Sequence, residues 1–267
     1  LTPLAQQDMG SFWMPPQSST VAPAVDAVFH FIFWTSSVFF VGIVLVMIYF
    51  VVRFRRRKGV EPGETAHHST PLEITWSVIP MILVAIMFYT GFRVFLDMSM
   101  PPANAYEINV TATKWSWTFS YPNGYIDENL HVPVDRPVKL LMQSEDVLHS
   151  FFVPAFRVKM DVVPGRYTHT WFRAVAPGEY VIFCTEYCGT GHSDMLSTVV
   201  VHPPGEFESW LEDASNFLAT LPPDEAGAKL IKSRGCPQCH SVDGSAGIGP
   251  TFTDLWGHTH ALADGAM

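Results

Sequence analysis

Charged side chains are scarce in this chain of 267 residues, and one long stretch has none. Residues 27–52, AVFHFIFWTSSVFFVGIVLVMIYFVV, carry no charge and exceed the about 20 residues that a helix needs to span a bilayer. Residues 74–96 form a second apolar stretch, interrupted by Pro80 and Arg93. The first run is too long for a lone signal peptide, whose apolar core has only about 7–15 residues. A buried helix of a soluble protein is the alternative for each stretch; we expect two membrane spans.

Acidic side chains are missing directly after the first stretch, where RFRRRK (53–58) holds five positive charges in six residues. Loops rich in Lys and Arg stay in the cytoplasm. We therefore expect a transmembrane hairpin over residues 25–97 with a cytoplasmic loop at 53–72. An N-terminal segment, residues 1–24, and everything after about residue 97 then lie on the outer side.

An excess of basic residues is also lacking, and this excludes nucleic acid as a partner, because phosphates demand a basic face. Residues 1–97 carry six basic and six acidic side chains, whereas residues 98–267 carry ten basic and nineteen acidic ones. The net charge of −9 thus resides on the outer part. It favours a basic partner; the alternative is that the acidity only keeps this part soluble.

After the hairpin, helical periodicity gives way to short segments rich in β-branched and aromatic residues. Turn signals such as YPNG (121–124) and APGE (176–179) separate them. This pattern predicts an antiparallel sandwich or barrel over residues 98–203. The expected strands are 107–113, 138–144, 167–174, 179–184 and 196–201.

The remaining residues are predicted to be helical. Apolar residues recur at helical intervals in GEFESWLEDASNFLA (205–219), which indicates an amphipathic helix. LPPD (221–224) follows as a stiff linker. We assign residues 204–222 to this helix and linker, and residues 223–267 to a separate C-terminal segment.

Only four cysteines are present, in two pairs with different neighbours. In CTEYCGTGHSDM (184–195), Cys184 and Cys188 share a short loop with His192 and Met195, and His149 stands upstream. On the outer side of a membrane such a pair can form a disulfide. Thiolate, imidazole and thioether together suit copper, whereas zinc rarely recruits methionine. A single blue copper needs one cysteine, so two copper ions bridged by both sulfurs would use the full set.

This loop, with SEDVLHSFFVP (144–154) before it, resembles the dinuclear CuA site of subunit II of haem–copper cytochrome c oxidases. The resemblance covers about residues 25–203 and implies a cupredoxin-like all-β sandwich after the two-helix hairpin. It also implies a set of copper ligands: bridging thiolates from Cys184 and Cys188, terminal imidazoles from His149 and His192, a weak Met195 ligand and the backbone carbonyl of Glu186.

The same resemblance implies three further roles. Trp115, in KWSWTFSYP (114–122), takes the position where electrons arrive; interface packing is the alternative. The Glu186 side chain would reach a magnesium ion shared with subunit I, unless it is a surface glutamate. Glu73, in LEITW (72–76), matches a residue at the mouth of a proton channel, but an acid at this place also suits a helix N-terminus.

The second cysteine pair lies in GCPQCH (235–240), a pattern typical of covalent haem c attachment. Cys236 and Cys239 would form thioethers and His240 would bind iron. A metal knuckle or a redox dithiol are alternatives. GIGPTFTDLWG (247–257) resembles the Gly-Pro segment that packs against haem in c-type cytochromes.

This segment is short for a cytochrome c domain. Only 27 residues follow His240, so we expect a partial α-helical cytochrome c domain at 223–267 and a native polypeptide that continues. Met267 lacks the flanking pattern of a sixth iron ligand, and His258 and His260 are expected to be loop histidines. At the other end, Leu1 in place of methionine suggests that an N-terminal segment was removed.

The resemblance implies a function. The chain would be the electron-accepting subunit of a terminal cytochrome c oxidase, an enzyme whose oxygen-reducing site lies on another chain and whose reaction drives proton translocation. Its partners would be oxidase subunits I and III, a cytochrome c or another donor, and the lipid bilayer of a bacterial plasma membrane, with both outer parts in the periplasm. Separately, the excess negative charge of the outer part makes Glu145 and Asp146 candidate docking groups for the cytochrome domain or a free donor.

Two other classes remain as alternatives. One is a CuA-containing protein similar to nitrous oxide reductase; the predicted transmembrane hairpin argues against this class. The other is a non-enzymatic copper-binding module of the membrane, in which a haem motif is hard to explain.

Overall fold

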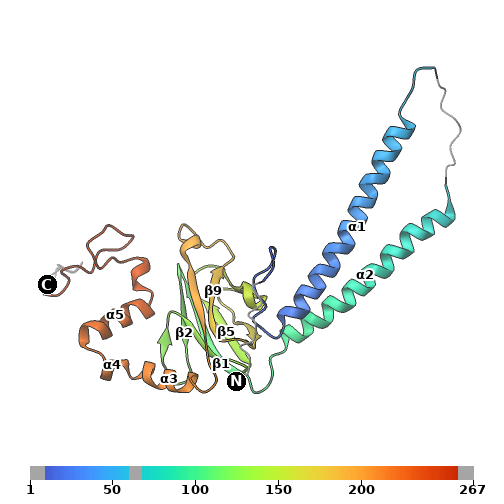
Figure 1. The fold of residues 1–267 in the computed structure, drawn as a ribbon. Helices are drawn as coiled ribbons and strands as arrows, with labels where there is room; N and C mark the ends of the chain where they lie inside the picture. Colours follow the sequence, from blue (N-terminus) through green and yellow to red (C-terminus); the bar gives the residue numbers. More distant parts are fainter. Residues whose placement is uncertain (1–9, 60–67, 258–267) are drawn as a thin grey trace. The chain divides into compact units, whose positions relative to one another are not determined.

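The computed structural model describes residues 10–59 and 68–257 of the chain (Figure 1). Residues 258–267, with His258, His260 and Met267, lie outside the described residues. The chain divides into two compact units, Val21–Met100 and Leu1–Thr20 with Pro101–Met267.

The first unit consists of two long helices. Helix α1 spans Ala22–Phe54 and α2 spans Thr70–Ser99, with 33 and 30 residues. At about 1.5 Å per residue, both exceed the roughly 30 Å thickness of the hydrocarbon core of a bilayer. The most apolar window of each helix has no buried residue, so large apolar side chains face outward all round. Such a surface suits lipid rather than water.

The second unit is built on two five-stranded sheets, which form a sandwich (Figure 1). One sheet has the order β3-β2-β1-β5-β8, with bounds Ile126–Asp127, Ser116–Ser120, Tyr106–Thr113, Val138–Ser144 and Thr168–Phe172. The other has the order β4-β10-β9-β6-β7, with bounds Leu130–Pro133, Leu196–His202, Gly178–Cys184, His149–Val153 and Val158–Val162.

Alternating burial explains why these segments form a sandwich. In β1 the side chains of Ile108, Val110 and Ala112 are fully buried, and their neighbours in sequence point the other way. Strand β5 follows the same period of two, which places one face of each strand in the core. The cupredoxin-like sandwich is therefore as predicted.

The strand directions differ from the prediction of a purely antiparallel fold. Strand β1 pairs with β5 in parallel, and β4 pairs with β10 in parallel. Parallel neighbours need a long crossover connection, and here whole strands lie between the partners along the chain. Short-range patterns do not reveal such long-range pairings, and the sequence pattern also missed the strands β2, β3, β4, β6 and β7.

The segment after the sandwich is helical. The single helix predicted at 205–219 is interrupted at Asn216, giving α3 (Phe207–Ser215) and α4 (Phe217–Thr220). Helix α5 spans Pro223–Ser233 and precedes a single 3₁₀ turn, η3, over Cys236–Gln238. Two further 3₁₀ turns, η1 (Pro154–Phe156) and η2 (His192–Asp194), interrupt the sandwich.

Aromatic contacts hold this helical segment on the sandwich. The Trp210 ring of α3 stacks on His131 of β4, with centroids 3.9 Å apart. Phe207 is buried, and its ring contacts Tyr106 and Tyr121. The helical segment therefore belongs to the same compact unit as the sheets.

Candidate metal centre

The loop with the first cysteine pair joins two neighbouring antiparallel strands at one end of the sandwich. Strand β9 ends at Cys184 and β10 begins at Leu196, which is paired with Phe183. On the other side of β9, Cys184 is paired with Phe151 of β6. Because alternate residues of a strand share a face, His149 faces the same side as Phe151. The sheet register thus brings His149 to the loop.

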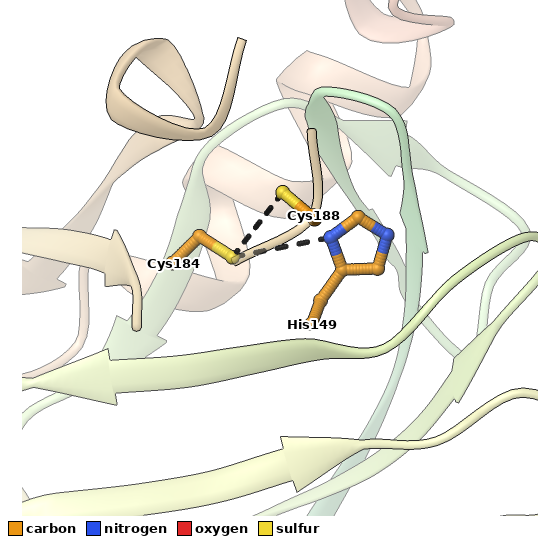
Figure 2. Close-up of side chains that lie close together, drawn as sticks. All are labelled: His149, Cys184 and Cys188. Carbon is orange, nitrogen blue, oxygen red and sulfur yellow. Dashed lines mark hydrogen bonds between the residues drawn. The ribbon is translucent and has the colours of Figure 1, made fainter. Parts of the chain in front are cut away.

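Figure 2 shows His149, Cys184 and Cys188 pointing toward one another. The Cys184 sulfur lies 3.8 Å from the Cys188 sulfur and 3.9 Å from Nδ1 of His149. The potential ligand atoms of these three residues all lie within 4.8 Å of one another.

The other predicted ligands lie around the same two sulfurs. Nδ1 of His192 is 3.6 Å from the Cys188 sulfur, and the Met195 sulfur is 3.9 Å from it. The backbone carbonyl oxygen of Glu186 is 3.4 Å from the Cys184 sulfur. The structure therefore brings all six predicted positions together.

This donor set fits a metal better than a disulfide. Both cysteines are free, and their sulfurs are far beyond the S–S bond length of about 2.05 Å. An ion about 2.3 Å from each of two thiolates allows up to about 4.6 Å between the sulfurs, as zinc–sulfur bonds show. Because His149 and Met195 are fully buried, the pocket can also exclude water. Two thiols, two imidazoles and a thioether suit copper.

Asp146 orients His149, a role that the sequence did not suggest. Its carboxylate accepts a hydrogen bond of 2.9 Å from Nε2 of His149, which leaves Nδ1 free to face the sulfurs. Burial opposes protonation of His149, but hydrogen bonds to Cys184 and Asp146 outweigh it and raise the pKa of the imidazole. Asp146 also accepts a hydrogen bond from the backbone N–H of Lys114, so both of its carboxylate oxygens are engaged although the residue is exposed.

The two thiols differ in acidity. Burial disfavours the thiolate at Cys184, but the hydrogen bond to His149 and backbone contacts lower its pKa below the usual value. Burial and the adjacent Cys184 raise the pKa of Cys188. Cys184 therefore ionises first, and a metal that binds both thiolates must displace a proton from Cys188.

Two tryptophans approach the cluster from the segment between β1 and β2 and from β2 itself. Trp115 donates from Nε1 to the carbonyl oxygen of Cys188 at 3.3 Å. The Trp117 ring lies edge-on to the His149 ring, with centroids 6.2 Å apart. The sequence singled out Trp115 and missed Trp117, whose burial depends on the packing of the two sheets.

Among the described residues, the carboxylates of Glu186 and Glu73 are not part of a group of side chains that could hold a metal ion. Glu186 is half-buried in the ligand loop. Glu73 lies in the first turn of α2, where its carboxylate accepts from the backbone N–H of Ser69 at 3.3 Å and lies 3.8 Å from Nδ1 of His68. That geometry is the helix N-terminal arrangement considered as the alternative.

The histidine that follows the second cysteine pair is held in a defined orientation. Cys236 and Cys239 are free thiols, the first residue of η3 and the residue directly after it. Nδ1 of His240 donates to the carbonyl oxygen of Pro250 at 2.7 Å, and the His240 ring stacks on Phe252. Because Nδ1 is committed to Pro250, Nε2 keeps a free lone pair. Two thiols and a histidine with a free Nε2 fit haem c. Pro250, whose carbonyl oxygen accepts the hydrogen bond from His240, belongs to the Gly-Pro segment noted in the sequence.

Comparisons with known proteins agree with this arrangement. Residues 6–94 match the family model "Cytochrome C oxidase subunit II, transmembrane domain", and residues 124–202 match "Cytochrome C oxidase subunit II, periplasmic domain". Cytochrome c oxidase subunit 2 of Alkalihalophilus pseudofirmus is 35% identical over 231 residues, covering 80% of this chain and 67% of its own length. The Synechocystis subunit 2 is 30% identical over 247 residues, covering 74% of each.

Among solved structures, the periplasmic domain of subunit II of cytochrome oxidase from Bradyrhizobium japonicum is 32% identical. It covers 44% of this chain and 98% of that domain, with a TM-score of 0.42. The match to a transmembrane domain, together with α1 and α2, confirms the prediction of a membrane protein with two spans.

Proposed function

Because the chain belongs to the cytochrome c oxidase subunit II family, a component of a haem–copper oxidase complex, we propose that it receives electrons at a dinuclear copper centre held by its ligand loop. Electrons would then pass to haem in subunit I, where oxygen is reduced to water and protons are translocated. The observation that carries the proposal is the gathering of four further ligand positions around two cysteine sulfurs 3.8 Å apart.

The proposed ligands have distinct tasks. Cys184 and Cys188 would bridge the two ions, and His149 and His192 would complete one ion each. The Met195 sulfur and the Glu186 carbonyl would be weak ligands. When bound, such a copper pair supplies one-electron transfer with little change in bond lengths, because the charge is shared by two ions.

The protein supplies preorganisation. Asp146 holds the His149 imidazole, and the strands β6, β9 and β10 hold the loop from both sides. Buried Met195 and His149 keep water away from the sulfurs. These features suit a relay rather than a centre that makes and breaks bonds.

We propose further that the C-terminal segment carries haem c on Cys236, Cys239 and His240 and passes electrons to the copper pair. The bonded Nδ1 of His240 supports this assignment. The same proposal includes four further roles. Glu186 would share a magnesium ion with subunit I, and Glu73 would lie at the mouth of a proton channel. Electrons would arrive at Trp115, and the chain would contact subunit III. The periplasmic placement of the sandwich also belongs to this proposal, and the basic segment RFRRRK after α1 is its support.

Metal analysis and spectroscopy of the purified complex test this proposal. We expect two copper ions and one haem c on this chain, and an electron-paramagnetic signal from one unpaired electron shared by two equivalent copper nuclei. A single copper with an ordinary one-nucleus signal would contradict the dinuclear centre. Absence of a covalently bound haem on this chain would contradict the role of the C-terminal segment.

A further inference from the structure

A cavity of about 710 Å³ separates the C-terminal segment from the sandwich. Its walls are Ser116 and Trp117 of β2, the turn around Glu128, and residues from α5 and η3, among them Pro237 and Gln238. The two residues between the paired cysteines of the haem motif therefore face the sheet that carries the tryptophans.

Specific contacts keep the C-terminal segment in this place. Gly235 lies so close to β2 that a Cβ atom added there would be 2.6 Å from Oγ of Ser116. Lys232 forms an ion pair of 3.2 Å with Glu128, and Nζ of Lys229 lies 5.2 Å from the centre of the Tyr125 ring. An ion pair at the surface contributes at most about 1 kcal/mol, so the close backbone approach of Gly235 defines the position most strictly.

Trp117 connects this cavity with the metal centre. Its side chain is only 2% exposed and lines the cavity. Its ring also contacts the rings of His149 and Phe151, with centroids 6.2 and 5.6 Å away. Its indole N–H is buried and has no hydrogen-bond partner in the described part of the chain.

Trp115 is placed differently. It is not among the residues that line the cavity. Its indole lies instead on the ligand loop, where it donates to the Cys188 carbonyl and contacts Gly189 and Gly191. The two tryptophans thus approach the same centre along two different lines, Trp117 through His149 and Trp115 through the loop that holds Cys188.

We propose that electrons from the C-terminal segment reach the copper centre through Trp117 and His149, whereas Trp115 serves a donor that binds from outside. This inference rests on the proposed function. Each transfer moves one electron: the haem iron goes from ferrous to ferric and the copper pair is reduced by one electron, with no bond made or broken. Transfer through protein weakens steeply with distance, so an aromatic ring that packs against His149 and lines the cavity facing the haem motif gives the stronger coupling.

The test uses the whole complex with Trp117→Leu and Trp115→Leu. Photoreduction of the haem, followed by the absorbance of the copper centre, gives the internal rate. Soluble cytochrome c added to the Cys236→Ala/Cys239→Ala variant, which lacks the haem, gives the external rate. We expect Trp117→Leu to slow the internal step at least about tenfold, about 1.4 kcal/mol in barrier, and Trp115→Leu to slow mainly the external step.

An unchanged internal rate in Trp117→Leu, or equal slowing of both steps by both variants, would overturn the proposal. The copper resonance signal reports whether the copper centre has changed, and the magnetic coupling between copper and haem iron reports whether the distance between the two sites has changed. If Trp117→Leu changes the copper signal or the magnetic coupling, Trp117→Phe is measured instead, because it keeps an aromatic ring beside Phe151. The proposal then predicts that Trp117→Phe slows the internal step, by less than Trp117→Leu does, and leaves the external step unchanged. Missing copper or haem signals in the wild type would instead refute the proposed function.

Discussion

The indole nitrogen of Trp115 donates a hydrogen bond of 3.3 Å to the carbonyl oxygen of Cys188. Trp115 precedes β2 in one sheet, whereas Cys188 lies in the loop between two strands of the other sheet. The bond therefore joins the two sheets beside the ligand cluster. It also positions an aromatic ring in direct contact with the backbone of a predicted copper ligand.

Replacement of Gly191 by alanine should displace this ring. Gly191 has an ordinary backbone conformation, but a Cβ atom would be 2.5 Å from Cδ2 of Trp115. Overpacking of this kind costs about 1–3 kcal/mol. We expect Gly191→Ala to alter the copper spectrum and to slow reduction by an external donor, measured by rapid mixing.

Gly227→Ala is the matched control, because nothing lies within 4 Å of the added Cβ and alanine favours a helix by about 1 kcal/mol over glycine. An unaltered spectrum and an unaltered rate in Gly191→Ala would show that the Trp115 ring has no such contact in solution.

Replacement of Cys188 by serine should abolish the dinuclear centre. A hydroxyl is a poor copper ligand, and only the Cys184 thiolate would remain as a soft anionic ligand. We expect the shared-electron signal to disappear and the copper content to fall to one ion or none, measured by elemental analysis. Tyr187→Phe, in the same loop with a side chain 75% exposed, should leave both unchanged. Retention of two coppers with the shared signal in Cys188→Ser would contradict the bridging role.

Acid should loosen the contact between α3 and the sandwich. Burial and the neighbouring His202 lower the pKa of His131 to about 3, and burial lowers the pKa of His202. Both lie below the unfolded value of about 6.5, so the unfolded state binds more protons in acid. The stability that neutral His131 contributes is complete above about pH 6.5 and is lost as pH falls toward 3.

Hydrogen exchange of the peptides of α3 and β4, corrected for the intrinsic effect of pH, measures this loss. His131→Phe keeps a ring against Trp210 and should reduce the dependence on pH. His169→Gln, at an exposed position, should retain it. Equal acid sensitivity in all three proteins would exclude His131 as the cause.

A methyl group at Gly249 should disturb the proposed iron ligand. A Cβ atom there would be 2.6 Å from Cε1 and 2.8 Å from Nδ1 of His240, close enough to push the imidazole from its bond with Pro250. We expect Gly249→Ala to retain the covalent haem but to shift its optical spectrum and its potential. Leu218→Ala, in α4 and outside this segment, with a side chain 64% exposed, should have no such effect. A native haem spectrum in Gly249→Ala would argue against this orientation of His240.

Charge reversal tests the docking of the C-terminal segment. Glu128→Lys would face Lys232 across 3.2 Å and weaken the contact by about 1 kcal/mol or less, an effect that salt should diminish. We expect a several-fold slower internal transfer in Glu128→Lys and recovery in the double variant Glu128→Lys/Lys232→Glu, measured by photoreduction. Failure of the double variant to recover would indicate that the pair does not contribute to docking.

The sequence by itself determined the two spans and the chemistry of the centre. An uncharged apolar run such as 27–52 is more stable in lipid than in water, and five of the six proposed ligand positions lie within twelve residues of one loop. Only the tertiary structure decided the parallel pairing of β1 with β5 and the hydrogen bond between His149 and Asp146. It also decided the position of Trp117 between the C-terminal segment and the candidate metal centre. These depend on contacts between residues far apart along the chain, which local patterns do not encode.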